Sequence, residues 1–485
     1  MPNALDVDMY QRPYELCLTD SYQFDVTVER QGNHFAAELR LSPAECSLVI
    51  RGDLTETRRT GFGWEDIDHL TCNGYAGTFF LYGLKFFSGG DRTLQRHPAP
   101  VSHFENRYRV SYVVHTRASL YRQPAFYFLD LYSPSIGQWV GSTHTQDEII
   151  KSHNDGTLFA NSSYAFKEFE QHVDGLGSIS IVYNPVSDYS SEKFSIGLSF
   201  APVLSLSFEI ARSASGAMDL VRELDTLFAF ILGSSLELEK IRLISADIQR
   251  MPVSLYYSRQ EIDLEKRGYS FFPLGKNLRY DTMGLPQFPT EVFSVYFGLS
   301  KDERLRFSKY VRYRALENPE ERFLGFFRLL EKLCYKKESF LEQSRLDQLI
   351  ERAEPFLVRY FRDEKNVRRM LNRLPGWNFS KLNTAACISS FLKTIPNSLR
   401  KRWVYESRHI QEICQFRNDL THANSIEPEW HDIDRKAKFI EALLVARLLK
   451  ELKISEEAIA SIVPRLSGHS LAEPPPQIRI TPALR

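Results

Sequence analysis

Hydrophobic residues follow two different periods along the chain. From residue 10 to about residue 215 they alternate with polar residues, as at Phe24, Val26 and Val28, and the alternation resumes at 35–41 after the Gly32-Asn33 turn. Alternation interrupted by turn residues is typical of antiparallel strands. The same pattern predicts further strands at 46–51, 77–87, 108–116, 125–132, 178–184 and 193–200. This spacing predicts a sandwich-like or jelly-roll-like β domain.

The second part of the chain has the period of a helix. One amphipathic helix is predicted at 216–233, before strand-like pieces at 240–257 and a Gly- and Pro-rich connection at 268–289. From about residue 300 the helical spacing continues and predicts helices at 302–316, 318–337, 339–362, 364–373, 382–395, 399–417 and 430–451. We therefore expect an α+β chain with a β-rich domain at 1–300, a helical bundle at 301–465 and a flexible Pro-rich tail at 466–485.

The formal net charge of the 485 residues is zero, but the charges are unevenly distributed. Residues 1–300 carry 26 Lys and Arg against 36 Asp and Glu, whereas residues 301–465 carry 33 against 24. The basic excess of the helical part has two interpretations. It is either a set of solvated helix faces or an electrostatic surface for a polyanion. The acidic first part is a candidate to dock against the basic second part as a latch.

The cysteines and the chain start indicate a cytoplasmic protein without a structural metal site. The six cysteines contain no CxxC pair and read as reduced thiols. The first ten residues lack the apolar segment of a secretory signal, and no apolar run reaches membrane-spanning length. His431, Asp432 and Asp434 resemble a metal ligand set only superficially, since they fall at a predicted helix start, where Asp is expected as a cap.

The strongest chemical signal is the hexapeptide Arg417-Asn418-Asp419-Leu420-Thr421-His422. It places a permanent cation, an amide and an imidazole within six residues. Such a set is suited to acid–base chemistry on a phosphodiester at neutral pH. In the structural alternative, Arg417 caps a carboxylate and His422 is an ordinary residue at a helix end.

This R-N-x-x-x-H pattern resembles the signature of HEPN domains, which are small helical bundles with an Arg and a His separated by a few residues. The acidic Glu331 on an early helix, and the segment YRALE at 313–317 before it, are similar to the Apea-like HEPN subgroup. The β-rich part is similar to the N-terminal domain that accompanies this subgroup in ApeA-type bacterial anti-phage proteins, at 77–79, 139–141 and 216–233.

The resemblance implies a metal-independent endoribonuclease that acts in abortive-infection defence under the control of the N-terminal domain. The RNA 2′-hydroxyl would attack the adjacent phosphorus and leave a cyclic phosphate end. His422 would be the general acid or base, Arg417 would hold the phosphate, and Asn418 would orient His422 or bond a phosphate oxygen. No cofactor is implied. RNA is the implied partner, transfer RNA is a candidate by analogy with related nucleases, and a phage protein is the candidate trigger.

The spacing of the motif has a geometric consequence. Five residues of one continuous helix would separate Arg417 from His422 by about 140° around the axis. Either the helix breaks near Asn418-Asp419, or the working site is composite. In HEPN proteins two units pair and bring two motifs together, so the resemblance favours a composite site and a homodimer formed through this domain.

Four further residues are candidates for the same site. Glu331 interrupts the apolar face of its helix, and it is either a structural partner of an Arg or a group that orients Arg417 or His422. Lys336 and Lys337 are candidates for phosphate contacts, with a solvated helix end as the alternative. Arg408 precedes the motif and is a candidate to widen the basic surface.

Two other function classes are also compatible with the sequence. In the first, the bundle is a non-catalytic module that binds RNA or a protein while the β-rich domain performs recognition. The second is a carbohydrate-binding or structural β protein with a helical tail, for which the sequence contains no motif.

Overall fold

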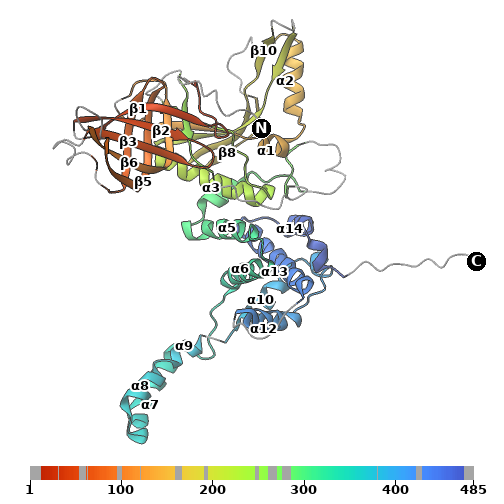
Figure 1. The fold of residues 1–485 in the computed structure, drawn as a ribbon. Coiled ribbons are helices and arrows are strands. Elements are labelled where there is room, and N and C mark those ends of the chain that lie inside the picture. The colour runs from red at the N-terminus through yellow and green to blue at the C-terminus, as the bar shows by residue number, and fades with distance from the viewer. Residues whose placement is uncertain are drawn as a thin grey trace, which may run out of the picture. The chain divides into compact units, whose positions relative to one another are not determined.

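The computed structural model describes residues 13–30, 32–53, 62, 64–94, 101–120, 122–158, 166–190, 195–245, 251–259, 270–275, 286–379, 381–421 and 429–474. The chain forms two compact units. The first contains 1–263, 273–282 and 287–299, and the second contains 264–272, 283–286 and 300–485. The first is rich in β structure and the second is largely helical (Figure 1). This confirms the predicted α+β class with a β-rich part before a helical part, while the β-rich part contains a closed barrel where a sandwich-like arrangement was expected.

The first unit begins with a closed antiparallel barrel of six strands. They are β1 (Tyr22–Arg30), β2 (Asn33–Leu41), β3 (Cys46–Asp53), β4 (Ile67–Gly74), β5 (Gly77–Leu94) and β6 (Val101–Thr116). Their order is β3-β2-β1-β4-β5-β6, and pairing of β3 with β6 closes the ring. Alternate residues point inward, so Phe24, Val26 and Val28 of β1 are buried. Gly32 adopts a φ of 76° in the β1–β2 turn, which favours glycine at that position.

The sheet continues from β6 into a second antiparallel group. Its strands, in order, are β14 (Val253–Tyr256), β13 (Lys240–Ser245), β7 (Phe126–Tyr132), β12 (Pro202–Arg212), β9 (Gly177–Tyr183) and β8 (Phe166–Val173). A separate hairpin contains β10 (Val186–Ser190) and β11 (Ser195–Ser199). The helices of this unit are α1 (Pro134–Val140), α2 (His144–Asn154), α3 (Ala214–Leu232) and α4 (Glu291–Gly298).

Helix α3 confirms the predicted amphipathic helix. It packs on β7 and β12, and its apolar stripe, including Leu224, Leu227 and Phe228, is fully buried. Ser213 caps its first turn, and Gly233 ends it in a left-handed conformation.

The described residues of the second unit form ten α-helices. They are α5 (Lys301–Arg314), α6 (Pro319–Cys334), α7 (Gln343–Phe361), α8 (Glu364–Leu371), α9 (Leu374–Asn378), α10 (Thr384–Lys393), α11 (Asn397–Arg400), α12 (His409–Thr421), α13 (Trp430–Glu451) and α14 (Glu456–Ile462), followed by the short 3-10 helices η2 (Val463–Arg465) and η3 (His469–Ala472). No helix in the described ranges is both long and apolar enough to cross a membrane.

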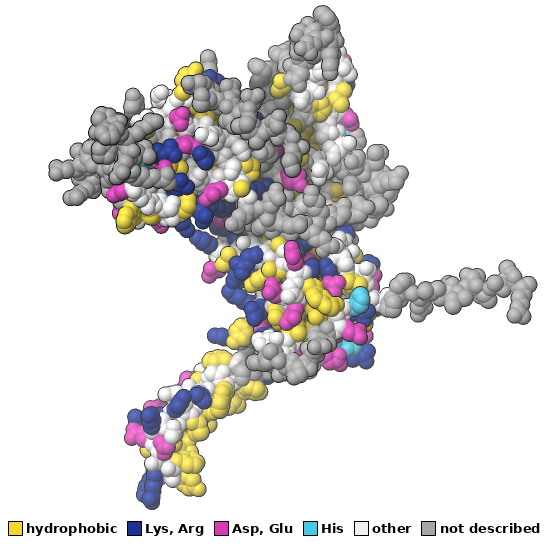
Figure 2. Space-filling model, viewed as in Figure 1, with side chains coloured by type: hydrophobic (Ala, Val, Ile, Leu, Met, Phe, Trp, Pro, Cys, Tyr) yellow, Lys and Arg dark blue, Asp and Glu magenta, His cyan; other side chains and the backbone are white. Residues whose placement is uncertain are grey.

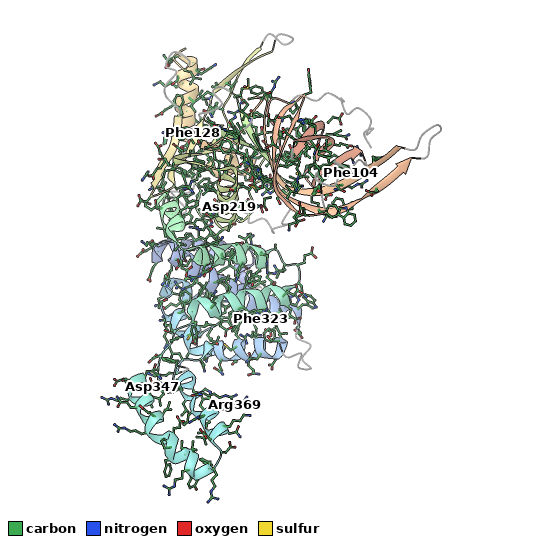
Figure 3. The ribbon with its side chains drawn as sticks, turned by 90° about the vertical axis from the view of Figure 1, so that its left-hand side faces the viewer. Phe104, Phe128, Asp219, Phe323, Asp347 and Arg369 are labelled. Atoms are coloured by element: carbon green, nitrogen blue, oxygen red, sulfur yellow. The ribbon has the colours of Figure 1, made fainter. Side chains whose placement is uncertain are left out.

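Helix α13 is the centre of this bundle and packs mainly on α6. Its residues Phe439 to Ala446 are almost completely buried. Helix α5 lies close to α6 because Gly325 has no side chain, and a Cβ at this position would meet the ring of Tyr313 at 2.6 Å. Figure 3 shows Phe323 of α6 inside this group of helices.

Two predictions for this part differ from the structure. The helix predicted at 399–417 is divided into α11 and α12, and Trp403 lies between them in the core. Trp403 stacks edge-on against Phe439, and its Nε1 donates to Nε2 of His469 at 3.0 Å. The predicted tail is therefore folded at His469–Ala472, while residues 475–485 lie outside the described residues.

Candidate functional site

Three residues of the predicted site lie together where one face of α6 meets α12. Phe323, Phe327 and Glu331 follow each other at intervals of four residues, so they lie on the same side of α6. Phe323 packs edge-on against Phe416 of α12 with ring centroids 5.4 Å apart. This packing places the next residue of α12, Arg417, over the ring of Phe327 at 5.3 Å.

The Glu331 carboxylate binds two different helices. Its Oε2 accepts from Nη2 of Arg417 at 2.6 Å, and its Oε1 accepts from Oγ1 of Thr384, the first residue of α10, at 2.7 Å. Because each carboxylate oxygen has a separate partner, Glu331 sets the position of Arg417 relative to α10. The ion pair is partly buried, with 26% of the Arg417 side chain and 31% of the Glu331 side chain exposed.

Arg417 is held at two points and still reaches a cavity. Its Nη1 donates to Oδ1 of Asn418 at 3.0 Å. Arg417, Asn418 and Glu331 line a cavity of about 200 Å³ together with Phe327, Asn383, Thr384, Ala385, Gln411 and Cys414. A guanidinium has five N–H donors, so two bonds leave donors that can bind an anion entering this cavity.

Cys414 lines the same cavity one turn before Asn418. Burial is the main cause that raises its pKa to about 11, and the negative charge of Glu331 adds to the effect. The thiol is therefore protonated at neutral pH and is not a nucleophile there.

Helix α12 continues through Arg417, Asn418 and Asp419 to Thr421. Thr421 Oγ1 donates back to the Arg417 carbonyl oxygen at 2.8 Å, as expected of a helical turn. Of the two alternatives for this motif, a helix break near Asn418-Asp419 is therefore excluded. His422 lies outside the described residues. With a break excluded in the described part of the helix, the composite site is the alternative that an experiment has to test.

The three predicted substrate-binding residues lie apart from the cavity. Lys336 and Lys337 follow the end of α6 and are exposed, and neither contributes to the cavity wall. Arg408 precedes the first residue of α12, is exposed and pairs with Glu406 at 3.4 Å. The structure thus brings together Glu331, Arg417 and Asn418 and leaves these three cations on the surface.

The sequence did not identify Thr384, Asn383 or Gln411 as members of the site. Thr384 is separated from Glu331 by 53 positions, and nothing in its neighbourhood marks it as more than a residue at a helix start. Asn383 caps α10 by accepting from the Ala386 backbone N–H at 2.8 Å. A pattern of spacing within one helix cannot detect partners that come from another helix.

No group of three or more His, Cys, Asp and Glu in the described ranges is arranged to hold a metal ion. His431, Asp432 and Asp434 lie in the first turn and a half of α13. There, Asp432 forms an ion pair with Lys436 one turn later.

Comparison with known proteins assigns the first unit to a family. The family model described as ApeA N-terminal domain 1 matches residues 26–277, a span that contains most of the barrel, the continuing sheet and α3. None of the curated proteins matches the chain. The hexapeptide at 417–422 lies beyond the matched residues. Because the match extends over more than half of the chain, this chain belongs to the ApeA N-terminal domain 1 family.

Proposed function

We propose that this protein is a metal-independent endoribonuclease of the HEPN type that acts in anti-phage defence. The observation that carries the proposal is the position of Arg417, the first residue of the R-N-x-x-x-H motif. Glu331 and Asn418 hold its guanidinium at the wall of a cavity. Membership of the ApeA N-terminal domain 1 family supports the defence context. The absence of a required cofactor is part of the proposal and follows from the resemblance of the motif.

Each residue has a proposed role in cleavage. Arg417 binds the scissile phosphate and stabilises the charge that develops on it. His422 transfers the proton of the attacking 2′-hydroxyl or of the leaving 5′-oxygen. Asn418 keeps the guanidinium in place, and Glu331 is a positioning residue because its two oxygens are occupied by Arg417 and Thr384.

The working site combines two copies of the motif. Helix α12 is continuous from Arg417 to Thr421, and positions five residues apart on a helix lie about 140° apart around its axis. This spacing favours a site in which Arg417 and His422 come from different copies. A homodimer through the helical unit would place Arg417 of one protomer beside His422 of its partner. The β-rich unit would hold this arrangement inactive until a trigger binds.

The test compares RNA cleavage by two variants that each lose one arginine. Arg417→Ala changes an arginine within α12, and Arg408→Ala changes the residue directly before this helix. We expect Arg417→Ala to lose at least about 100-fold of the activity, as for removal of a donor that stabilises developing charge. Arg408→Ala should keep the wild-type rate because Arg408 does not line the cavity. Equal activity of the wild type and Arg417→Ala would contradict the proposal.

The alternative is a module that binds RNA or a protein without cleaving RNA. The Arg417–Glu331 pair itself favours it, because an ion pair between two helices is also a common structural contact. The module would be favoured if the wild-type protein stops cell growth and binds RNA, while the RNA recovered from these cells stays intact.

A further inference from the structure

Helices α7, α8 and α9 form an arm whose main contacts are within the arm itself. Figure 1 shows these helices extending away from the other helices of their unit, and Figure 3 places Asp347 and Arg369 on the two neighbouring helices α7 and α8. Only Leu346, Val367 and Leu371 of α7 and α8 are buried. A hairpin with so few buried side chains leaves most of its apolar surface in water.

The base of the arm adjoins the candidate site. Phe340 N–H donates to the Asn378 carbonyl at 3.0 Å, and Lys381 N–H donates to the Glu338 carbonyl at 3.3 Å, so the two chain segments that enter and leave the arm are paired. The Asn378 side chain bonds both backbone groups of Leu341. Two residues beyond Lys381, Asn383 begins the stretch that lines the cavity with Arg417.

An exposed apolar row runs along α7. Leu349, Phe356 and Tyr360 fall within about 40° of one another around the helix axis, and they are 59%, 67% and 70% exposed. The rings of Phe356 and Tyr360 are stacked, with centroids 6.1 Å apart and planes 21° from parallel. In Figure 2 hydrophobic side chains follow one side of the arm, and this patch marks an interaction surface.

A row of arginines flanks the apolar row. Arg345, Arg352 and Arg359 recur every seven residues and lie about 60° from the apolar row around the axis. Arg345 pairs with Glu342 at 2.9 Å. Within the described ranges neither Arg352 nor Arg359 has a carboxylate partner. Flat rings beside unpaired guanidiniums fit a ligand with stacking faces and regularly spaced negative charges.

We propose that this face of α7 binds single-stranded RNA. Unpaired bases stack on aromatic rings, and arginines bind the phosphates between them. The inference deepens the proposed function, because it adds a place where substrate is held before it enters the cavity at the base of the arm. A second copy of the chain fits less well. Two copies packed antiparallel through the same row would bring their arginine rows together, and like charges oppose such packing.

The test measures binding without cleavage, using the full chain with Arg417→Ala as the parent. Fluorescently labelled oligouridine is titrated at several salt concentrations, alone and annealed to its complement. Phe356→Ala/Tyr360→Ala should weaken binding of the single strand about tenfold or more, since stacking on one base contributes that much. It should leave the salt dependence unchanged.

The charge variants have a matched control on the same arm. Arg352→Glu/Arg359→Glu should make binding less dependent on salt. The negative slope of log K against log salt should become shallower by about 1.4, which is about 0.7 for each of two lost phosphate contacts on a single strand. Lys365→Glu/Arg369→Glu reverses two charges on α8 opposite its buried Val367 and Leu371. This control should weaken binding less than the α7 pair.

Three outcomes would overturn the proposal. The first is no measurable binding by the parent. The second is an equal loss of RNA affinity in the α7 and α8 charge variants with no loss in the aromatic variant. This result would indicate nonspecific electrostatic attraction. The third is a change of oligomeric state in the aromatic variant with unchanged RNA binding, which assigns the row to a second copy. Failure of cleavage by the wild type, with the expected binding pattern intact, would reject the nuclease and leave the arm as an RNA-binding element.

Discussion

At the scale of single residues, Glu331 has the contacts of a positioning group. Both of its oxygens are used, one by Arg417 and one by Thr384. The pair with Arg417 is partly open to solvent, so it contributes only about 1 kcal/mol or less to stability. Its main effect is therefore on the direction of the guanidinium.

Glu331→Gln tests this role. The amide keeps the shape of the side chain but loses the charge that holds Arg417, so thermal stability should change little. RNA cleavage should fall by about 10- to 100-fold, since small displacements of a catalytic group have effects of this size. The fall should appear in kcat more than in KM. Full activity in Glu331→Gln would show that Arg417 needs no carboxylate to act.

Cys414 provides a second test at this scale. Because burial raises its pKa to about 11, iodoacetamide should modify it much more slowly than a free thiol at pH 8, where the thiolate is the reactive form. Mass spectrometry of the native protein, with urea-unfolded protein as the control, measures this difference. Modification of Cys414 at the same rate in both samples would contradict the burial of this wall of the cavity.

At the scale of elements, long periodic segments were predictable and short ones were not. Helices α3, α5, α6 and α13 follow their predicted ranges within a few residues, because each buries a continuous apolar stripe. The short helices α1 and α2 of the β-rich unit were not predicted, since neither has such a stripe. The helix predicted at 399–417 was wrong at Trp403, whose side chain is buried against Phe439 and His469, contacts that no local pattern encodes.

The same limit applies to the candidate site. Glu331 and Arg417 were identifiable because a carboxylate interrupts an apolar helix face and a basic residue belongs to a motif. Their direct contact at 2.6 Å was one of two interpretations of Glu331. The contribution of α10 through Thr384 depends on how three helices pack, which the sequence does not specify.

The C-terminal segment after η2 offers a test of packing at the level of an element. Truncation after Ser467 removes His469 and the bond that Trp403 donates to it, and it also removes the backbone bond from Val404 to Ala472. Loss of these buried contacts should lower the free energy of unfolding by about 2 kcal/mol or more.

Truncation after Pro474 is the control, because it retains His469, Ala472 and the Arg402–Glu473 ion pair. Its unfolding midpoint in urea should match that of the full chain. If both truncations behave alike, η3 does not stabilise the helical unit.

At the scale of the whole molecule, the chain passes between its two units more than once. The described residues 270–272 and Pro286 belong to the helical unit, although α4 at Glu291–Gly298 belongs to the β-rich unit. A fragment that begins at residue 300 therefore lacks part of the helical unit. A fragment that begins at residue 264 carries α4, which belongs to the β-rich unit. Regulation by the β-rich unit is best tested in the full chain.

The proposed composite site predicts complementation between two inactive proteins. Arg417→Ala and His422→Ala should each lack RNA cleavage. When the two are co-refolded, a mixed dimer contains one site with Arg417 from one protomer and His422 from its partner, so part of the activity should return. Mixing either variant with itself is the control. No recovery, with mixed dimers verified by differently tagged chains, would place both residues of a working site on the same chain.

The chemistry of the RNA ends tests the central claim most directly. RNA recovered after incubation with the wild-type protein should carry 2′,3′-cyclic phosphate ends, because the attacking group is the neighbouring 2′-hydroxyl. The same ends should be missing with Arg417→Ala and with His422→Ala at equal protein concentration. Cleavage that leaves other ends, or cyclic phosphate ends produced equally by the wild type and both variants, would contradict the account.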